Sequence, residues 1–245
     1  MLQRIDYEAD GTPLTGWYAA PPGGAPVPGV LVAHEAPGVG AHVKQAAERL
    51  AAEAGYAAFA LDLYGGEGFA LEEARRLHQE MMETPGLMVR RALAGLAALQ
   101  AQPRVDRSRL GVVGFCQGGI TALELARAGA PIRAAIGFHP GLKRPAGSPE
   151  GPIAAKVLMM VGDADPVVPP QDRLAFARDM SAAGADWQLR LYGGVGHSFT
   201  NRDVDALGFP GFRYDARASG RSWVAMLALL KEVFDEQRPD GHRFR

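Results

Sequence analysis

An apolar segment that breaks at a glycine and leads directly into a predicted helix constrains the fold of this chain more than any other feature. Residues 110–120 read LGVVGFCQGGI, with a glycine two positions before Cys116 and another two positions after it. A residue at the tip of so tight a turn has an unfavourable backbone angle, and these neighbours must be small to clear the adjacent backbone. The pattern G-x-C-x-G therefore predicts a strand, a sharp turn at Cys116 and a helix.

Cys116 has two interpretations at this point. Free N–H groups and the positive end of the helix dipole favour a negatively charged sulfur beside the helix N-terminus, and thiolate is the nucleophilic form of cysteine. A buried cysteine is, however, often a small apolar filler, and short glycine motifs also arise by chance. A base and an acid further along the chain are needed to decide between them.

Composition limits the class of protein. With 245 residues, a formal net charge of −1 and 47% hydrophobic residues, the chain is typical of one soluble α/β domain spanning residues 1–245. The charge balance argues against a nucleic-acid partner. No apolar run is suited to a signal peptide or a membrane span, so we expect a cytoplasmic protein with no membrane partner. The single cysteine excludes an internal disulfide and a multi-cysteine metal site.

Strands and helices alternate along most of the sequence. Residues 3–7 and 14–19 predict an antiparallel hairpin around a tight turn, and the polar residues after Gln237 predict a frayed end. Further strands are predicted at 30–33, 57–61, 110–115, 132–138, 157–161 and 188–192, and helices at 43–54, 71–83, 87–100, 119–128, 169–183 and 217–235. This order predicts an α/β fold with a mostly parallel sheet, helices on both faces and antiparallel N-terminal edge strands.

Ligands of such sheets bind at the carboxyl ends of the strands, so chemistry is expected in the residues that follow each strand. Cys116 follows one strand, Asp163 and Asp165 follow a later one, and His197 lies in a glycine-rich loop after the last. The order nucleophile, acid, histidine is that of α/β-hydrolases and differs from trypsin-like and subtilisin-like enzymes. We therefore interpret Cys116, Asp165 and His197 as a catalytic triad. Asp163 competes for the acid role, or is a turn or capping residue.

The sequence resembles the dienelactone hydrolases, a cysteine-using branch of the α/β-hydrolase fold, over nearly its whole length. The matching segments are Glu35, 62–65 (DLYG), 114–119 (GFCQGG), 162–169 (GDADPVVP) and 196–201 (GHSFTN). The resemblance implies a three-layer α/β-hydrolase sandwich that cleaves small esters or lactones without a cofactor. It also implies Cys116 as nucleophile, His197 as base and Asp165 as the acid that orients the histidine.

The same pattern implies an oxyanion hole made of two backbone N–H groups, which map to Ala36 and Gln117. Attack of the thiolate on an ester carbonyl would give an acyl-enzyme that water hydrolyses with the help of His197. In the family, a glutamate at the position of Glu35 lies beside the thiol and governs its ionisation until substrate arrives. A nearby anion disfavours thiolate, which would protect the sulfur from oxidation. A solvated loop carboxylate is the alternative for Glu35.

Substrate recognition is less closely defined by the resemblance. Dienelactone-cleaving members bind a substrate carboxylate with arginines at two positions that hold Gly66 and Asn201 here. Arg202 follows the second position, and Arg75 or Arg76 reaches inward only if it is not solvated on its helix. The candidates that we select for the substrate pocket are Tyr64, Phe199, Arg202 and His139, with a structural role equally open for His139.

We expect a small-molecule ester or lactone as substrate, a monomer or homodimer, and no metal site, because the histidines lack the close paired spacing of zinc ligands. A second class of function remains open, namely a non-hydrolytic redox or sensor protein that uses Cys116 as an oxidisable thiol. It fits poorly because the chain has no resolving cysteine. A ligand-binding module without catalysis is disfavoured because no member of the predicted triad is missing.

Overall fold

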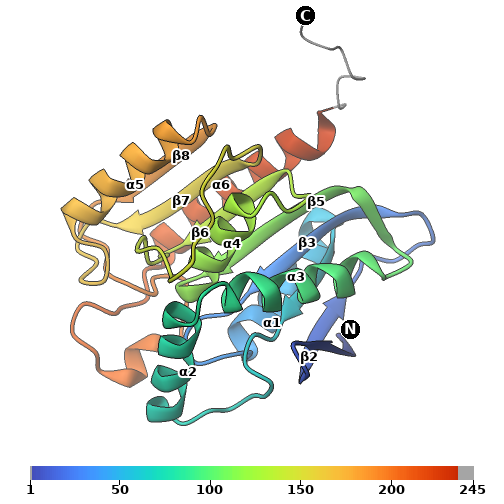
Figure 1. Ribbon diagram of the computed structural model, residues 1–245, viewed down its shortest axis with the longest axis horizontal. Coiled ribbons are helices and arrows are strands. Elements are labelled where there is room, and N and C mark those ends of the chain that lie inside the picture. Colours follow the sequence, from blue (N-terminus) through green and yellow to red (C-terminus); the bar gives the residue numbers. More distant parts are fainter. Residues whose placement is uncertain (1, 237–245) are drawn as a thin grey trace, which may run out of the picture.

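One sheet forms the centre of the protein (Figure 1). The computed structural model describes residues 2–236, and eight strands within them pair in the order β1-β2-β4-β3-β5-β6-β7-β8. Their bounds are β1 (Gln3–Ala9), β2 (Thr12–Ala19), β3 (Val27–Ala33), β4 (Ala57–Leu61), β5 (Val105–Phe115), β6 (Ala134–Phe138), β7 (Lys156–Gly162) and β8 (Trp187–Tyr192). Strands β3 to β8 pair in parallel, whereas β1 and β2 pair antiparallel at one edge. The predicted α/β fold is confirmed.

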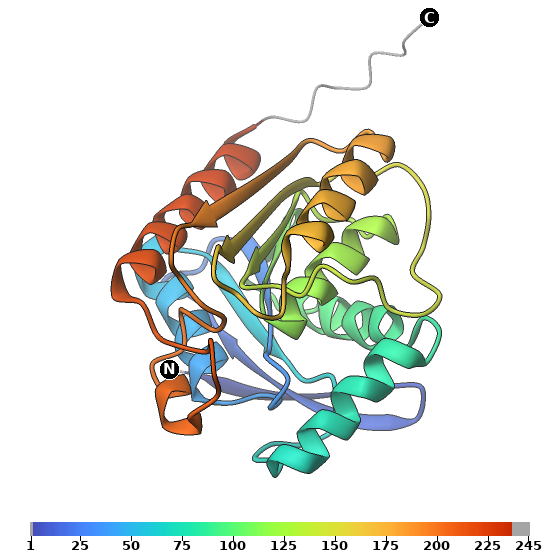
Figure 2. The same cartoon turned by 90° about the vertical axis from the view of Figure 1, so that its left-hand side faces the viewer.

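Helices cover both faces of this sheet (Figure 2). The helices α2 to α5 lie on one face, and α1 and α6 lie on the other. Their bounds are α1 (Ala41–Arg49), α2 (Leu71–Glu83), α3 (Leu87–Gln100), α4 (Gln117–Arg127), α5 (Pro170–Ala182) and α6 (Ala216–Asp235). No helix within residues 2–236 is both long enough and apolar enough to cross a membrane. The end that was predicted to fray lies outside the described residues.

The predicted helix over residues 43–54 differs in detail from the one observed. An α-helix begins at Ala41, and its last turn, Leu50–Ala54, widens into a π-helical turn. Gly55 ends this turn with φ 71°, a left-handed angle that glycine adopts without steric penalty. The sequence pattern correctly indicated a glycine end but carried no sign of the wider turn.

The central strands are continuously apolar because helices bury both of their faces. In β3, Leu31 packs into the cluster beneath α2 to α5, whereas Val30 and Val32 pack into the cluster beneath α1 and α6. All three side chains are fully buried. Since side chains alternate between faces, an uninterrupted apolar run is what two covered faces require.

The register of the parallel strands sets where the loops begin. Ala33 pairs with Leu61 on one side and with Gly114 on the other, and Phe115 pairs with Phe138. The residues that follow β3, β4, β5 and β6 therefore emerge at one edge of the sheet, as expected for a parallel arrangement.

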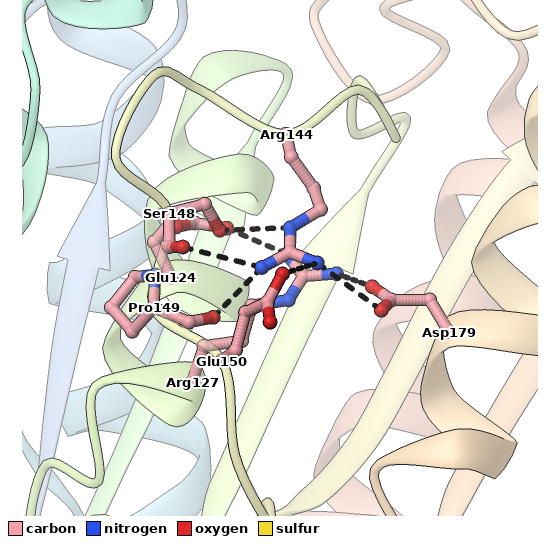
Figure 3. Close-up of polar contacts among 7 residues, drawn as sticks. All are labelled: Glu124, Arg127, Arg144, Ser148, Pro149, Glu150 and Asp179. Atoms are coloured by element: carbon pink, nitrogen blue, oxygen red, sulfur yellow. Dashed lines mark hydrogen bonds and ion pairs between the residues drawn. The ribbon is translucent and has the colours of Figure 1, made fainter.

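A partly buried ion-pair cluster fastens the loop between β6 and β7 to α4 and α5 (Figure 3). Arg127 of α4 donates to Glu124, at 2.6 Å, and to Asp179 of α5. Arg144 of the loop donates to the same Asp179, at 3.4 Å, and to the carbonyl oxygen of Pro149, at 2.8 Å. Glu124 is completely buried, so its charge depends on the guanidinium of Arg127 for compensation.

Replacing Arg127 by methionine removes this cation and leaves the carboxylate of Glu124 buried. We expect the free energy of unfolding of Arg127→Met to fall by about 3–5 kcal/mol, the usual cost of breaking a buried pair. Arg76→Met is the control, because Arg76 is exposed and its pairs with Glu73 and Glu80 lie at the surface. Urea unfolding measures both variants, and equal stability of the two would contradict the expected role of Arg127.

Candidate active site

The turn at Cys116 is the sharpest backbone feature of the site. Cys116 joins β5 to α4 with φ 51° and ψ −112°, a conformation that residues other than glycine rarely adopt. A Cβ atom on Gly114 would lie 1.8 Å from the carbonyl oxygen of Gly118, and one on Gly118 would lie 2.1 Å from that of Ala33. Both neighbours of the turn must therefore be glycine, as the motif indicated.

His197 links Cys116 to Asp165. Its Nε2 lies 3.2 Å from Sγ of Cys116, and its Nδ1 lies 2.8 Å from Oδ2 of Asp165. His197 and Asp165 are buried, whereas Cys116 is partly exposed and accessible to a small molecule. Asp163, the competing carboxylate, instead pairs with Arg173 at 3.0 Å and is largely exposed. The geometry therefore favours Asp165 as the partner of the histidine.

The charges along this chain of contacts reinforce one another. Burial by itself would lower the pKa of His197, but the negative charge of Cys116 and the hydrogen bonds and charge of Asp165 raise that pKa to about 10. The imidazole is thus protonated at neutral pH when the sulfur is ionised. The site therefore places the sulfur of Cys116 beside an imidazole, and the protonated form of that imidazole favours an ionised sulfur.

The two backbone groups predicted to form the oxyanion hole lie in the loops after β3 and β5. Among residues 2–236, neither the N–H of Ala36 nor that of Gln117 donates a hydrogen bond to a protein acceptor. His34 fixes the first loop, because its Nδ1 donates to the carbonyl oxygen of Glu35 at 2.7 Å and its Nε2 accepts from the N–H of Leu63 at 3.2 Å. Burial lowers the pKa of His34, and the neutral ring satisfies both bonds.

Glu35 is buried, which excludes the alternative of a solvated loop carboxylate. Its oxygens accept hydrogen bonds from Ser198 Oγ at 3.2 Å, Asn201 Nδ2 at 2.7 Å and His42 Nδ1 at 3.2 Å. Burial would raise the pKa of Glu35, but these bonds and the nearby histidines lower it to about 2. Within the described residues its oxygens form no hydrogen bond with Cys116. Glu35 is therefore an ionised group with its own set of donors.

Tyr64 and His78 contact the side chain of Gln117, the residue that follows Cys116. The carboxamide oxygen of Gln117 lies 2.6 Å from the hydroxyl of Tyr64 and 2.5 Å from Nδ1 of His78 on α2. Gln117 is completely buried, and His78 is partly exposed. The sequence analysis did not select His78, although its position four residues after the buried Ala74 places it on the inner face of α2.

Among the described residues, the other candidates for the substrate pocket form no hydrogen bond with the sulfur, and the ring centroid of His139 lies 5.3 Å from that of His197. Phe199 is fully buried, with its ring against His139 and Tyr192. His139 is also buried, burial lowers its pKa well below the ordinary value, and its Nε2 lies 2.7 Å from Thr200 Oγ1. Arg202 lies over the ring of Tyr214 and lines a cavity of about 560 Å³ between α1 and α6. Cys116 does not line that cavity.

Sequence reasoning also missed three residues that organise Glu35, namely His42, Ser198 and Asn201 as a donor. The segment 196–201 was quoted for the resemblance, but nothing in a loop sequence indicates which of its side chains turn toward Glu35. No group of three or more His, Cys, Asp or Glu residues within residues 2–236 is arranged to hold a metal ion.

The chain is similar to several known proteins in sequence and in fold. The sequence model of the dienelactone hydrolase family matches residues 15–234. A Bradyrhizobium protein named probable 2-oxo-3-(5-oxofuran-2-ylidene)propanoate lactonase is 30% identical over 244 residues, which cover 94% of each chain. An uncharacterised Caenorhabditis elegans protein is 38% identical over 151 residues, 61% of this chain and 96% of its own. A crystal structure titled as a dienelactone hydrolase-like promiscuous phosphotriesterase from metagenomic libraries is 36% identical, matches 96% of this chain and 98% of its own, and has a TM-score of 0.88.

Alkylation of Cys116 with iodoacetamide tests the charge arrangement. The modified sulfur carries no negative charge, so the pKa of His197 should fall well below 10 and its ring should be neutral at pH 8. Nitrogen-15 NMR of labelled histidines measures the protonation of the ring before and after alkylation. His34 is the internal control, because it is buried and its ring bonds with Glu35 and Leu63 and not with the sulfur. An imidazolium signal of His197 that survives alkylation at pH 8 would contradict the thiolate as its source.

Proposed function

The chain belongs to the dienelactone hydrolase family and is an ester or lactone hydrolase, and from this premise we propose that it acts through a Cys116–His197–Asp165 triad and an acyl-enzyme. The observation that supports the proposal best is the unbroken line of contacts from a partly exposed sulfur to a buried carboxylate, with distances of 3.2 Å and 2.8 Å. A sulfur that served as core filler would need neither contact.

In the first step, the thiolate of Cys116 attacks the carbonyl carbon and forms a C–S bond, while the carbonyl electron pair moves to the oxygen. The free N–H groups of Ala36 and Gln117 are the proposed donors to this oxyanion. When the carbonyl re-forms, the C–O bond to the leaving group breaks, and His197 gives its proton to the departing oxygen. With a lactone substrate, the leaving oxygen stays attached to the acyl group by the opened ring.

In the second step, the now neutral His197 takes a proton from water, and the resulting hydroxide attacks the thioester. The C–S bond breaks, the sulfur leaves as thiolate and pairs again with the imidazolium, and the product is a carboxylic acid. Asp165 holds Nδ1 of the ring throughout, so Nε2 faces the sulfur and the water in turn. Both half-reactions use the same imidazole.

For Glu35 we propose control of the ionisation of Cys116. Its negative charge is held by His42, Asn201 and Ser198, and a carboxylate that left these donors for the sulfur would disfavour the thiolate. A substrate that keeps the carboxylate of Glu35 bonded to these donors would therefore favour the thiolate of Cys116, which is the nucleophilic form.

The proposed compartment and the alternative function both depend on the redox chemistry of Cys116. We place the protein in the cytoplasm, because a reducing compartment keeps a catalytic thiolate from oxidation. The alternative of a redox sensor requires reversible oxidation of Cys116 and no acyl transfer. Mass spectrometry separates the two, since an ester substrate leaves an acyl group on Cys116 only in the hydrolase.

Removal of the nucleophile or the base should abolish hydrolysis. We expect Cys116→Ala and His197→Ala to fold normally and to lose at least about 10³-fold in kcat for p-nitrophenyl acetate, because members of a triad act as a unit. Asp163→Asn is the matched control, since Asp163 follows the same strand as Asp165 and its largely exposed carboxylate pairs with Arg173 and not with His197. Turnover by Cys116→Ala at the wild-type rate would refute the proposal. The turnover of a panel of lactones, carboxylic esters and one phosphotriester then ranks these compounds as substrates.

The proposed role of Glu35 predicts a change in thiol titration. In Glu35→Gln the anion is absent, so the ultraviolet absorbance of the thiolate should persist to a lower pH than in the wild type, by on the order of one pH unit. The control is Glu67→Gln, because Glu67 bonds with Trp17 and Lys44 at the surface. Identical titration curves for wild type and Glu35→Gln, with and without a substrate analogue, would remove the idea.

A further inference from the structure

A hydrogen-bonded link joins α2 to the residue that follows the nucleophile. Gln117 begins α4, and its carboxamide oxygen receives hydrogen bonds from Tyr64, in the loop after β4, and from His78 on α2. We propose that His78 is a positioning residue for the proposed hydrolysis, and that it acts through Gln117 to hold the backbone N–H that receives the oxyanion. The inference rests on the proposed function and extends it to a helix that carries none of the residues of the triad.

The two hydrogen bonds define how the carboxamide is oriented. An amide oxygen has two lone pairs, which here are taken by the Tyr64 hydroxyl at 2.6 Å and His78 Nδ1 at 2.5 Å. Burial raises the pKa of Tyr64, so its hydroxyl remains a donor. Nδ1 of His78 carries the other proton, because an amide oxygen only accepts. Both donors therefore point toward the same atom, the carboxamide oxygen of Gln117.

The nitrogen of the same carboxamide makes His78 more important for this orientation. Nε2 of Gln117 is buried and has no hydrogen-bond partner among the described residues. The carboxamide is consequently held by its oxygen alone. Loss of the His78 donor would leave the Tyr64 bond as the one remaining restraint, and the amide group could rotate about it to relieve the unpaired nitrogen.

The backbone of Gln117 is where such a rotation would affect catalysis. Its N–H is the first of α4 and has no protein acceptor within residues 2–236, as an oxyanion donor requires. Oxyanion donors act over 2.7–3.1 Å, so a displacement of a few tenths of an ångström weakens the bond in the transition state. The binding of the substrate ground state does not depend on that bond to the same degree.

Helix α2 also has an exposed side chain whose contacts lead toward His197. Arg75, one turn before His78, has its guanidinium carbon 5.9 Å from the centroid of the Phe209 ring. Phe209 packs against Phe212, whose ring centroid lies 4.7 Å from that of His197. Residues at i and i+3 of α2 therefore lie at two ends of the same group of contacts: Arg75 connects to His197 through two phenylalanine rings, and His78 connects to Gln117.

Steady-state kinetics with p-nitrophenyl acetate test the link. His78→Leu should lower kcat by on the order of tenfold with KM changed less than about twofold, because the lost alignment matters in the transition state. His78→Asn should recover most of kcat, since the asparagine amide nitrogen can donate from nearly the same place as Nδ1. Gln79→Leu is the control, because the neighbouring Gln79 bonds with Glu83 at the surface.

A double-mutant cycle separates positioning from a general structural effect. In a Gln117→Leu background the carboxamide is absent, so His78→Leu should cause no further loss of kcat. Hydrogen exchange of the first turn of α4 should be faster in His78→Leu than in Gln79→Leu.

Three results would overturn the inference. They are full kcat in His78→Leu, the same fold-loss in both backgrounds, and unchanged exchange in the first turn of α4. Equal turnover by the wild type and Cys116→Ala would instead reject the proposed function on which the inference rests. An active wild type with full kcat in His78→Leu would reject the inference alone.

Discussion

The close approach of two backbone segments at Gly114 and Gly118 is the constraint on which this site depends. It allows Cys116 to turn with φ 51° and to present its sulfur to His197 instead of to the core. His139 and Ser198, in two neighbouring loops, also have positive φ angles. Each such residue costs about 1–3 kcal/mol, so the surrounding structure must hold it in place. The fixed register of the parallel strands provides that support, because their carboxyl ends anchor the loops after β5 and β6.

Burial organises the charges into two groups with different donors. The sulfur of Cys116 and the carboxylate of Asp165 share the imidazole of His197, while Glu35 has hydrogen bonds from three other side chains. The pKa of Glu35 is lowered to about 2, so Glu35 is ionised across the neutral range, and the pKa of His197 is raised to about 10 when the sulfur is ionised. Because the two groups use separate donors, the charge of Glu35 can be accommodated without drawing the imidazolium away from the sulfur.

The sequence allowed prediction of the features that depend on periodicity and chain order. Alternating apolar strands and helices indicated the sheet, and its parallel strands place Cys116 and Asp165 at one edge. His78 was not predicted, because its contact with Gln117 joins residues 39 apart, with α3 and β5 between them in the sequence. The pocket role predicted for Phe199 remains untested, and its ring lies in the core. Loop residues have no repeating sequence pattern that indicates which side chains face solvent. The orientation of each loop side chain is therefore set by its tertiary contacts.

Asn201 shows how the resemblance and the geometry combine. It lies where dienelactone-cleaving relatives have an arginine for the substrate carboxylate, yet here its amide donates to Glu35 at 2.7 Å. A neutral donor satisfies Glu35 without adding a cation near Cys116, and Arg202 lies over Tyr214 in the cavity between α1 and α6 that Asn201 also lines. This side of the site therefore serves the glutamate, and a neutral ester meets no unpaired charge from Asn201.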